Sequence, residues 1–109
     1  MSSENNQAQM LKGVLEMCIL SILNNNEAYT SELLDKLKNA KLIVVEGTLY
    51  PLLTRLKNAS WLTYRWEESV SGPPRKYYAI TEEGKTKLNS LMKAWDELQT
   101  SVNTLTTNK

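Results

Sequence analysis

Apolar residues recur at helical spacing in successive segments of the first half of the chain, and they predict helices. The first helix covers residues 10–23 and is apolar over most of its surface, so other parts of the molecule must cover it on more than one side. The second runs from about Tyr29 or Thr30 to Ala40, with Thr30 or Ser31 as its N-cap. Residues 1–9 are polar, and we expect them to be disordered.

A third helix is indicated by leucines at positions i, i+3, i+4 and i+7, the pattern of a helix with one buried face; they are Leu49, Leu52, Leu53 and Leu56. With Thr48 as N-cap, Pro51 would lie in the first turn, where its missing N–H costs nothing. The rest of this helix carries hydroxyls, an amide and cations, which suit phosphates and base edges. These candidate DNA-binding residues are Thr48, Tyr50, Thr54, Arg55, Lys57 and Asn58. An ordinary solvated helix face is the alternative.

Alternating apolar and polar residues then predict a β-hairpin, with strands over residues 61–67 and 77–81. The turn over residues 68–74 is rich in Ser, Gly and Pro and includes Gly72 and Pro73. Arg75 and Lys76 follow the turn directly. A hairpin with basic residues beside its loop forms a wing, able to lie along a phosphate backbone. A hairpin that only packs on the helices is the alternative.

The last predicted helix begins after Thr81, its expected N-cap, and reaches about residue 106. Its apolar residues alternate spacings of three and four, the seam of a coiled coil; the seam consists of Leu88, Leu91, Trp95, Leu98, Val102 and Leu105. Such a helix is about 37 Å long and must overhang a domain of this size. We therefore predict a homodimer, in which this seam and Leu11 of the apolar first helix contact the partner.

Composition and charge narrow the function. The net charge is only +1, but residues 41–81 hold six Lys and Arg against three Asp and Glu, so positive charge gathers around the third helix and the hairpin. The chain has no histidine, and its one cysteine, Cys18, lies in an apolar run, which excludes most zinc sites and acid–base triads. We therefore expect neither an enzyme nor a cofactor. Without a signal sequence or an apolar span, we expect a cytoplasmic protein and no membrane partner.

Two longer motifs and one shorter one resemble the PadR family of transcriptional regulators. Residues 46–56 read Glu-Gly-Thr-Leu-Tyr-Pro-Leu-Leu-Thr-Arg-Leu, similar to that family's recognition helix. Residues 72–84 read Gly-Pro-Pro-Arg-Lys-Tyr-Tyr-Ala-Ile-Thr-Glu-Glu-Gly, similar to its wing and the start of its dimerisation helix. Residues 12–16 resemble its first helix. Ser60 stands where the family usually has glycine, and Val45 where it often has serine.

The resemblance implies a dimer that binds inverted-repeat operators, with the recognition helix in the major groove and the wing tip near the minor groove. It also makes the start of the second helix, at Tyr29, Thr30 and Ser31, a candidate contact to the DNA backbone. In similar multidrug-responsive regulators a tryptophan lines a pore at the dimer interface and stacks on flat aromatic drugs, and Trp95 matches it. Candidate neighbours in that ligand site are Met10, Val14, Met17 and Met92. Plain dimer core is the alternative for Trp95.

The sequence therefore predicts an α+β, mostly α fold: a winged helix-turn-helix with a two-stranded wing and a long C-terminal dimerisation helix. The expected division is a disordered segment over residues 1–9, the DNA-binding domain over 10–81 and the dimerisation helix over 82–109. The predicted function is a sequence-specific DNA-binding repressor, with double-stranded DNA, a second copy and a planar aromatic small molecule as partners. A winged-helix module for protein interaction or ligand sensing, with little DNA binding, is the alternative.

Overall fold

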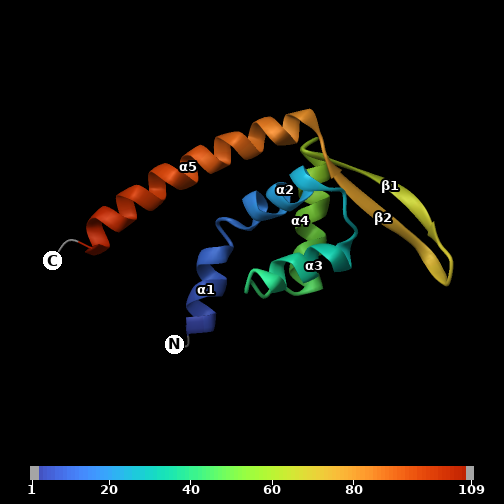
Figure 1. Cartoon of the computed structure of the whole chain (residues 1–109), viewed down its shortest axis with the longest axis horizontal. Coiled ribbons are helices and arrows are strands. Elements are labelled where there is room, and N and C mark those ends of the chain that lie inside the picture. Colours follow the sequence, from blue (N-terminus) through green and yellow to red (C-terminus); the bar gives the residue numbers. More distant parts are fainter. Residues whose placement is uncertain (1–2, 108–109) are drawn as a thin grey trace.

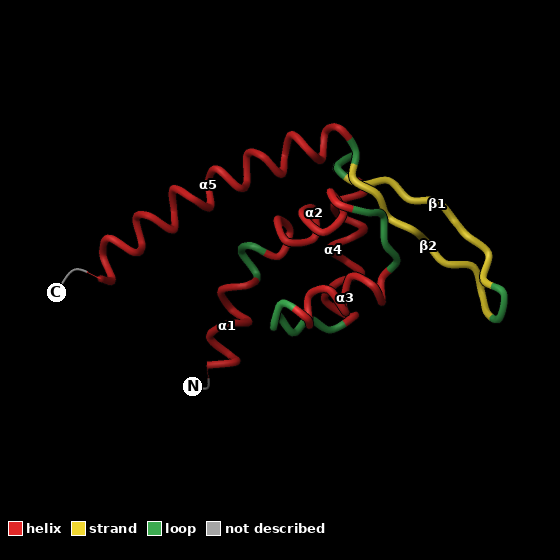
Figure 2. The backbone as a smooth tube through the Cα atoms, in the orientation of Figure 1, coloured by secondary structure: helices red, strands yellow, loops and turns green. Residues whose placement is uncertain are grey.

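The computed structural model describes residues 3–107, which form a mostly helical fold with one β-hairpin (Figures 1 and 2). The elements in chain order are α1 (Ser3–Leu11), α2 (Leu15–Asn25), α3 (Thr30–Asn39), α4 (Glu46–Asn58), β1 (Leu62–Ser69), β2 (Gly72–Ile80) and α5 (Glu82–Thr107). The hairpin and the far half of α5 extend from the helical body in opposite directions (Figure 1). The α+β, mostly α architecture is thus the predicted one. No helix within residues 3–107 is long and apolar enough to cross a membrane.

The core lies where α2, α3 and α4 meet, and leucine dominates it. The predicted stripe of α4 is confirmed, because all four of its leucines are buried. The side chains with almost no exposed surface come from α2, α3 and α4; they are Ile19, Leu20, Leu33, Leu37, Leu49, Leu53 and Leu56. Packing on this core fixes α4 against the helices before it and leaves its remaining faces open.

The hairpin is antiparallel, with Leu62 opposite Ile80 and Tyr64 opposite Tyr78. Its strands are longer than predicted: of residues 68–74, only Val70 and Ser71 lie outside the strands, because pairing continues past an irregularity between Glu67 and Ser69. Pro73 and Pro74 of β2 lie at this irregularity, where neither has a paired partner in β1, so their missing N–H groups are tolerated. The prediction that all of residues 68–74 form a turn is therefore wrong.

The start of the chain also differs from the prediction. Instead of one helix over residues 10–23, α1 ends at Leu11 and α2 begins at Leu15. Between them, Gly13 N–H donates to the Met10 carbonyl at 3.2 Å and Val14 N–H to the Leu11 carbonyl at 2.9 Å, a tight turn that breaks the helix. Residues 3–9, expected to be disordered, belong to α1, and residues 1–2 of that expectation lie outside the described part of the chain.

Of the predicted helix caps, the one of α5 is confirmed and those of α3 and α4 are wrong. Thr81 is the cap of α5, since Gly84 N–H donates to its Oγ1 at 2.9 Å. For α3 the N-cap is Tyr29, whose N–H donates to the Glu32 carboxylate at 3.1 Å, and neither predicted cap is correct. For α4 the N-cap is Val45, so Pro51 lies beyond the first turn and has no N–H to donate to the Gly47 carbonyl.

The junction between the hairpin and α5 is built from close backbone contacts. Ser60 has a φ of 68°, a left-handed conformation that glycine adopts more easily. Its carbonyl accepts from Thr81 Oγ1 at 2.6 Å, and the Trp61 carbonyl accepts from Thr81 N–H at 3.1 Å. A Cβ added at Gly84 would lie 2.1 Å from that Trp61 carbonyl oxygen. α5 therefore leaves the body at an angle that only glycine at this position allows.

Gly84→Ala should lower the free energy of unfolding by about 3 kcal/mol, because the new methyl group meets backbone rather than a flexible side chain. The matched control is Gly47→Ala, where an added Cβ has no atom within 4 Å. There alanine's higher helix propensity should raise stability by up to about 1 kcal/mol. Urea unfolding of both variants checks this. Equal stability of the two variants would contradict the proposed contact.

Candidate nucleic-acid interface

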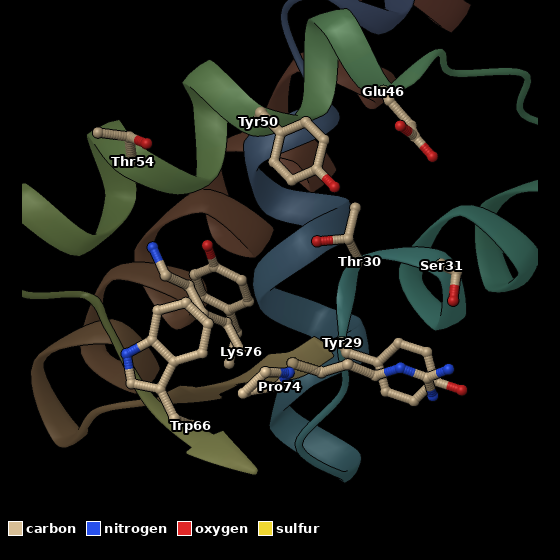
Figure 3. Close-up of a pocket in the computed structure, with 11 residues that line it drawn as sticks. Tyr29, Thr30, Ser31, Glu46, Tyr50, Thr54, Trp66, Pro74 and Lys76 are labelled. Atoms are coloured by element: carbon tan, nitrogen blue, oxygen red, sulfur yellow. The ribbon is translucent and has the colours of Figure 1, made fainter. Parts of the chain in front are cut away.

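A cavity of about 430 Å³ lies between α3, α4 and the hairpin (Figure 3). The hairpin face that borders it carries the pairs Tyr64–Tyr78 and Trp66–Lys76 and is called the inner face below. Its lining consists of Tyr29, Thr30, Ser31, Glu46, Tyr50, Thr54, Trp66, Pro74, Arg75, Lys76 and Tyr78. Candidate DNA-binding residues from three separate segments thus meet at one surface. From α3 and its cap these are Tyr29, Thr30 and Ser31, from α4 Tyr50 and Thr54, and from β2 Arg75 and Lys76.

α4 presents Tyr50 and Thr54 one helical turn apart, on a face next to its buried leucines. Tyr50 is half exposed, and its ring reaches from α4 toward the start of α3 (Figure 3). Thr30 and Ser31 are the first two residues of α3, where backbone N–H groups lack acceptors within the helix. The cavity thus carries hydroxyl groups from both helices and the positive end of one helix dipole.

Arg75 and Lys76 are neighbours on β2, so their side chains leave the strand on opposite faces. Lys76 Nζ lies 4.5 Å from the centre of the Tyr64 ring and 5.3 Å from that of Trp66, on the inner face. The Arg75 guanidinium lies 4.5 Å from the centre of the Tyr29 ring, at the edge of the cavity. Neither cation forms an ion pair with a carboxylate within the described residues, so both charges remain available to an anion.

Arg65, on β1, is held differently. Its guanidinium donates to the carboxylates of Glu27 and Glu67, and it lies over the Tyr77 ring at 4.9 Å. The hydrogen bond from Arg65 holds the pKa of the Glu27 carboxyl below its usual value. The charge of Arg65 is therefore balanced locally by two carboxylates, in contrast to the free cations of β2.

The remaining candidates lie outside the cavity. Arg55 pairs with Glu16 at the start of α2, with 3.2 Å between Nη2 and Oε2. Thr48 and Lys57 are exposed on α4, and Lys57 Nζ lies 5.8 Å from the centre of the Tyr64 ring. Gly72 and Pro73 lie at the far end of the hairpin. The chain thus brings one part of the predicted set together and leaves the other spread around it.

Four lining residues were not among the predicted site residues: Glu46, Trp66, Pro74 and Tyr78. The alternation of β1 does put Trp66 on the same strand face as Leu62 and Tyr64, but it does not tell where the strand leaves the core. Along that face Leu62 is buried and Tyr64 half-buried, whereas Trp66 is 60% exposed. Glu46 adds one carboxylate at the start of α4.

A second surface lies between α1 and the far half of α5. An apolar groove of about 860 Å³ there is lined by Asn6, Gln7, Met10, Leu11, Gly13, Val14, Leu42, Trp95, Leu98, Gln99, Val102 and Asn103. Of the candidate ligand-binding residues, Met10, Val14 and Trp95 line this groove. Met17 and Met92 line, again with Trp95, a smaller cavity of about 310 Å³ between α2, α3 and α5. Trp95 also lines a third hollow, of about 340 Å³, together with Val14 and Met17, so it borders each of these cavities.

The exposure of the seam residues increases along α5. Leu88 is 3% exposed and Leu91 half-buried, whereas Leu98 is 56% and Leu105 79% exposed. The near half of the seam packs within the chain, mainly against α2, and the far half has no cover. Leu11 is also buried in the chain's own core. Leu11 and Leu88 are thus buried within one chain, whereas the farther seam residues Leu98 and Leu105 are exposed.

Solved structures with the same fold are numerous. A PadR-like transcription factor from Bacteroides fragilis is 54% identical, with 93% of this chain and 98% of that one covered and a TM-score of 0.78. A PadR-like transcriptional regulator from Bacillus cereus is 41% identical, with 93% and 99% covered and a TM-score of 0.81. Bacillus subtilis PadR in complex with operator DNA shares the fold at 23% identity and a TM-score of 0.67, over 72% of this chain and 47% of that one.

The match to a sequence family covers most of the fold. Residues 19–90, from α2 through the first turns of α5, match the family described as transcriptional regulator PadR-like. This span includes α4, the whole hairpin and the cavity between them. This chain is therefore a member of the PadR-like family of transcriptional regulators.

Proposed function

We propose that this chain acts in the cytoplasm as a homodimeric repressor that binds inverted-repeat operator DNA. The observation that carries the proposal is the cavity at which hydroxyl groups of α3 and α4 meet the unpaired cations of β2. Phosphates take hydrogen bonds from such hydroxyls and from helix N-termini, and they attract free cations. Bacillus subtilis PadR, which has this fold, is known in complex with operator DNA, and this supports the same partner here.

Each DNA-facing element has its own role in this proposal. α4 enters the major groove, where Tyr50, Thr54 and the exposed Thr48 reach base edges. The hairpin follows the neighbouring backbone with Arg75 and Lys76, and Gly72 and Pro73 let its tip approach the minor groove. Thr30 and Ser31 donate to a phosphate at the start of α3. Arg55 joins the contacts only by leaving Glu16, its partner at 3.2 Å.

The proposed dimer forms through the far half of α5. Exposed apolar side chains there, such as Leu98 and Leu105, continue the spacing of the buried Leu88, so a second helix fits the same seam. The groove beside α1 gives the partner's helix an apolar surface to cover. A two-fold dimer presents two copies of α4, which matches an inverted repeat with two half-sites. The DNA surface and the dimer surface lie on different parts of the chain and do not compete.

Relief of repression by a planar aromatic ligand is the most specific part of the proposal. Trp95 is 39% exposed and lines both the groove beside α1 and the cavity between α2, α3 and α5. In a dimer, flat ligands can stack on such an indole. Methionines on both sides, Met10 in the groove and Met17 and Met92 in the cavity, form an adaptable wall. Such a ligand relieves repression only if it binds the DNA-bound and free states with different affinity.

Removal of both wing cations, by Arg75→Ala with Lys76→Ala, should weaken binding to all DNA sequences alike. It should also reduce the slope of log affinity against log salt by about 0.9 for each phosphate that the wing no longer neutralises. Fluorescence anisotropy measures this, with a duplex enriched by the protein from a random-sequence pool and an unselected duplex of equal length.

The charge-matched control is Lys85→Ala with Lys93→Ala, both exposed on α5 and away from the cavity. It should leave the salt slope unchanged. An unchanged slope in the wing variant would contradict the assignment of phosphate contacts to the wing. Failure of the parent chain to bind either duplex would favour the protein-interaction or ligand-sensing alternative.

Leu98→Glu with Val102→Glu should convert the dimer into a folded monomer. Both side chains are exposed in the single chain, so the charges do not disturb its core but place carboxylates inside the proposed seam. Sedimentation velocity measures the mass, and circular dichroism checks the helix content. Thr100→Glu, exposed on the other side of α5, should remain dimeric. A double variant that still sediments as a dimer would refute this interface.

Trp95→Ala should weaken the binding of a stacked planar aromatic cation by about 1–3 kcal/mol while operator affinity stays within a few-fold. Isothermal titration with ethidium and Hoechst 33342 measures the first quantity, and anisotropy with the enriched duplex measures the second. Sedimentation confirms that the variant is still a dimer. Binding that does not depend on Trp95, or no binding by either dye, would leave this tryptophan as dimer core.

A further inference from the structure

The most exposed aromatic side chain beside the proposed DNA surface is Trp66. It projects from the inner face of β1, opposite Lys76 of β2, and lines the cavity shared with α4 (Figure 3). Its ring lies edge-on to Tyr64, with 6.2 Å between centroids, and 60% of its surface is exposed. A single exposed apolar residue is ordinary, but Trp66 shares its cavity with the half-exposed Tyr50. The cavity therefore offers aromatic surface as well as polar groups.

The groups around the cavity are complementary to the groups of a nucleic-acid strand. A DNA strand alternates anionic phosphates with sugar rings that are apolar on much of their surface. The cavity offers a partner for each, with the ammonium of Lys76 beside the indole of Trp66 and hydroxyls of Thr30 and Ser31 on the other side (Figure 3). A surface with cations alone would bind the phosphates but leave the apolar faces of the sugars exposed to water.

We propose that Trp66 packs its indole on a deoxyribose of the DNA strand whose neighbouring phosphates bind Lys76 and Arg75. This inference rests on the proposed DNA-binding function and adds a contact to it. Because the sugar is the same at every position, the contact strengthens binding to any sequence and carries no discrimination. Because it is apolar, it releases no counterion and adds nothing to the salt dependence.

A second role for the indole has to be separated from this one. Lys76 Nζ lies 5.3 Å from the centre of the Trp66 ring, a distance at which the ring attracts the ammonium. If Trp66 acted only by holding Lys76, its loss would reduce the salt slope, as loss of the lysine does. The salt slope thus distinguishes direct contact with the sugar from positioning of the cation.

The test compares Trp66→Ala, Trp66→Phe and Lys76→Ala by fluorescence anisotropy at several salt concentrations, on the enriched and the unselected duplex. Trp66→Ala should bind both duplexes roughly tenfold more weakly, with the salt slope of the parent chain. Trp66→Phe keeps a flat ring and should bind less than about threefold more weakly. Thr63→Ala, exposed on the other face of β1, serves as the control for strand stability and should stay within about twofold of the parent.

Three outcomes would overturn the inference while DNA binding by the parent chain stands. Trp66→Ala could bind as tightly as the parent, it could lower the salt slope as Lys76→Ala does, or it could weaken only the enriched duplex. Failure of the parent chain to bind either duplex is a different result, because it removes the proposed function and this contact with it. Thermal unfolding by circular dichroism shows that each variant is folded before it is compared.

Discussion

The attachment of the hairpin to the helices is the interaction on which the proposed DNA surface depends. A two-stranded hairpin alone is only marginally stable in water. Here Ala28, in the loop before α3, exchanges two hydrogen bonds with Tyr78 of β2, at 3.0 Å and 2.8 Å. Leu62 and Tyr78 are buried at the same end of the hairpin. This short pairing fixes Lys76 and Trp66 opposite α4, since they follow on the same inner face.

Most of the fold could be predicted because it depends on periodic burial. The four leucines of α4 and the alternation of the strands are local patterns, and both correspond to real elements. The cap at Thr81 was also visible, since its hydroxyl serves a nearby backbone N–H. The caps of α3 and α4 differ from the prediction because the path of the chain decides them, and residues that favour the cap position, Thr30, Ser31 and Thr48, lie close by. The break after Leu11 depends on a turn that apolar spacing does not reveal.

Site residues could be predicted where their own chemistry identifies them. They could not be predicted where contacts with distant parts of the chain decide their role. Basic residues directly after a turn, as at Arg75 and Lys76, are recognisable from sequence, because the Gly and Pro of the turn mark their place. Arg55 has equally suitable chemistry, but its carboxylate partner comes from α2, far away in the chain. Trp66 continues an apolar alternation, which is typical of a core residue. Only the point at which the hairpin leaves the helices reveals that its indole faces the cavity.

The contact between Gly84 and the Trp61 carbonyl has a consequence for how such chains diversify. The main chain of the junction, the Thr81 hydroxyl, Gly84 and the buried Leu88 hold the first half of α5, whereas Leu98 and Leu105 of its far half are exposed. The exposed half of the helix can therefore accumulate substitutions without changing its angle to the rest of the molecule. Evolution, or a protein engineer, can alter that half to suit a new small molecule or a new pairing preference. The helices and the hairpin that form the cavity keep their geometry when that half of α5 changes.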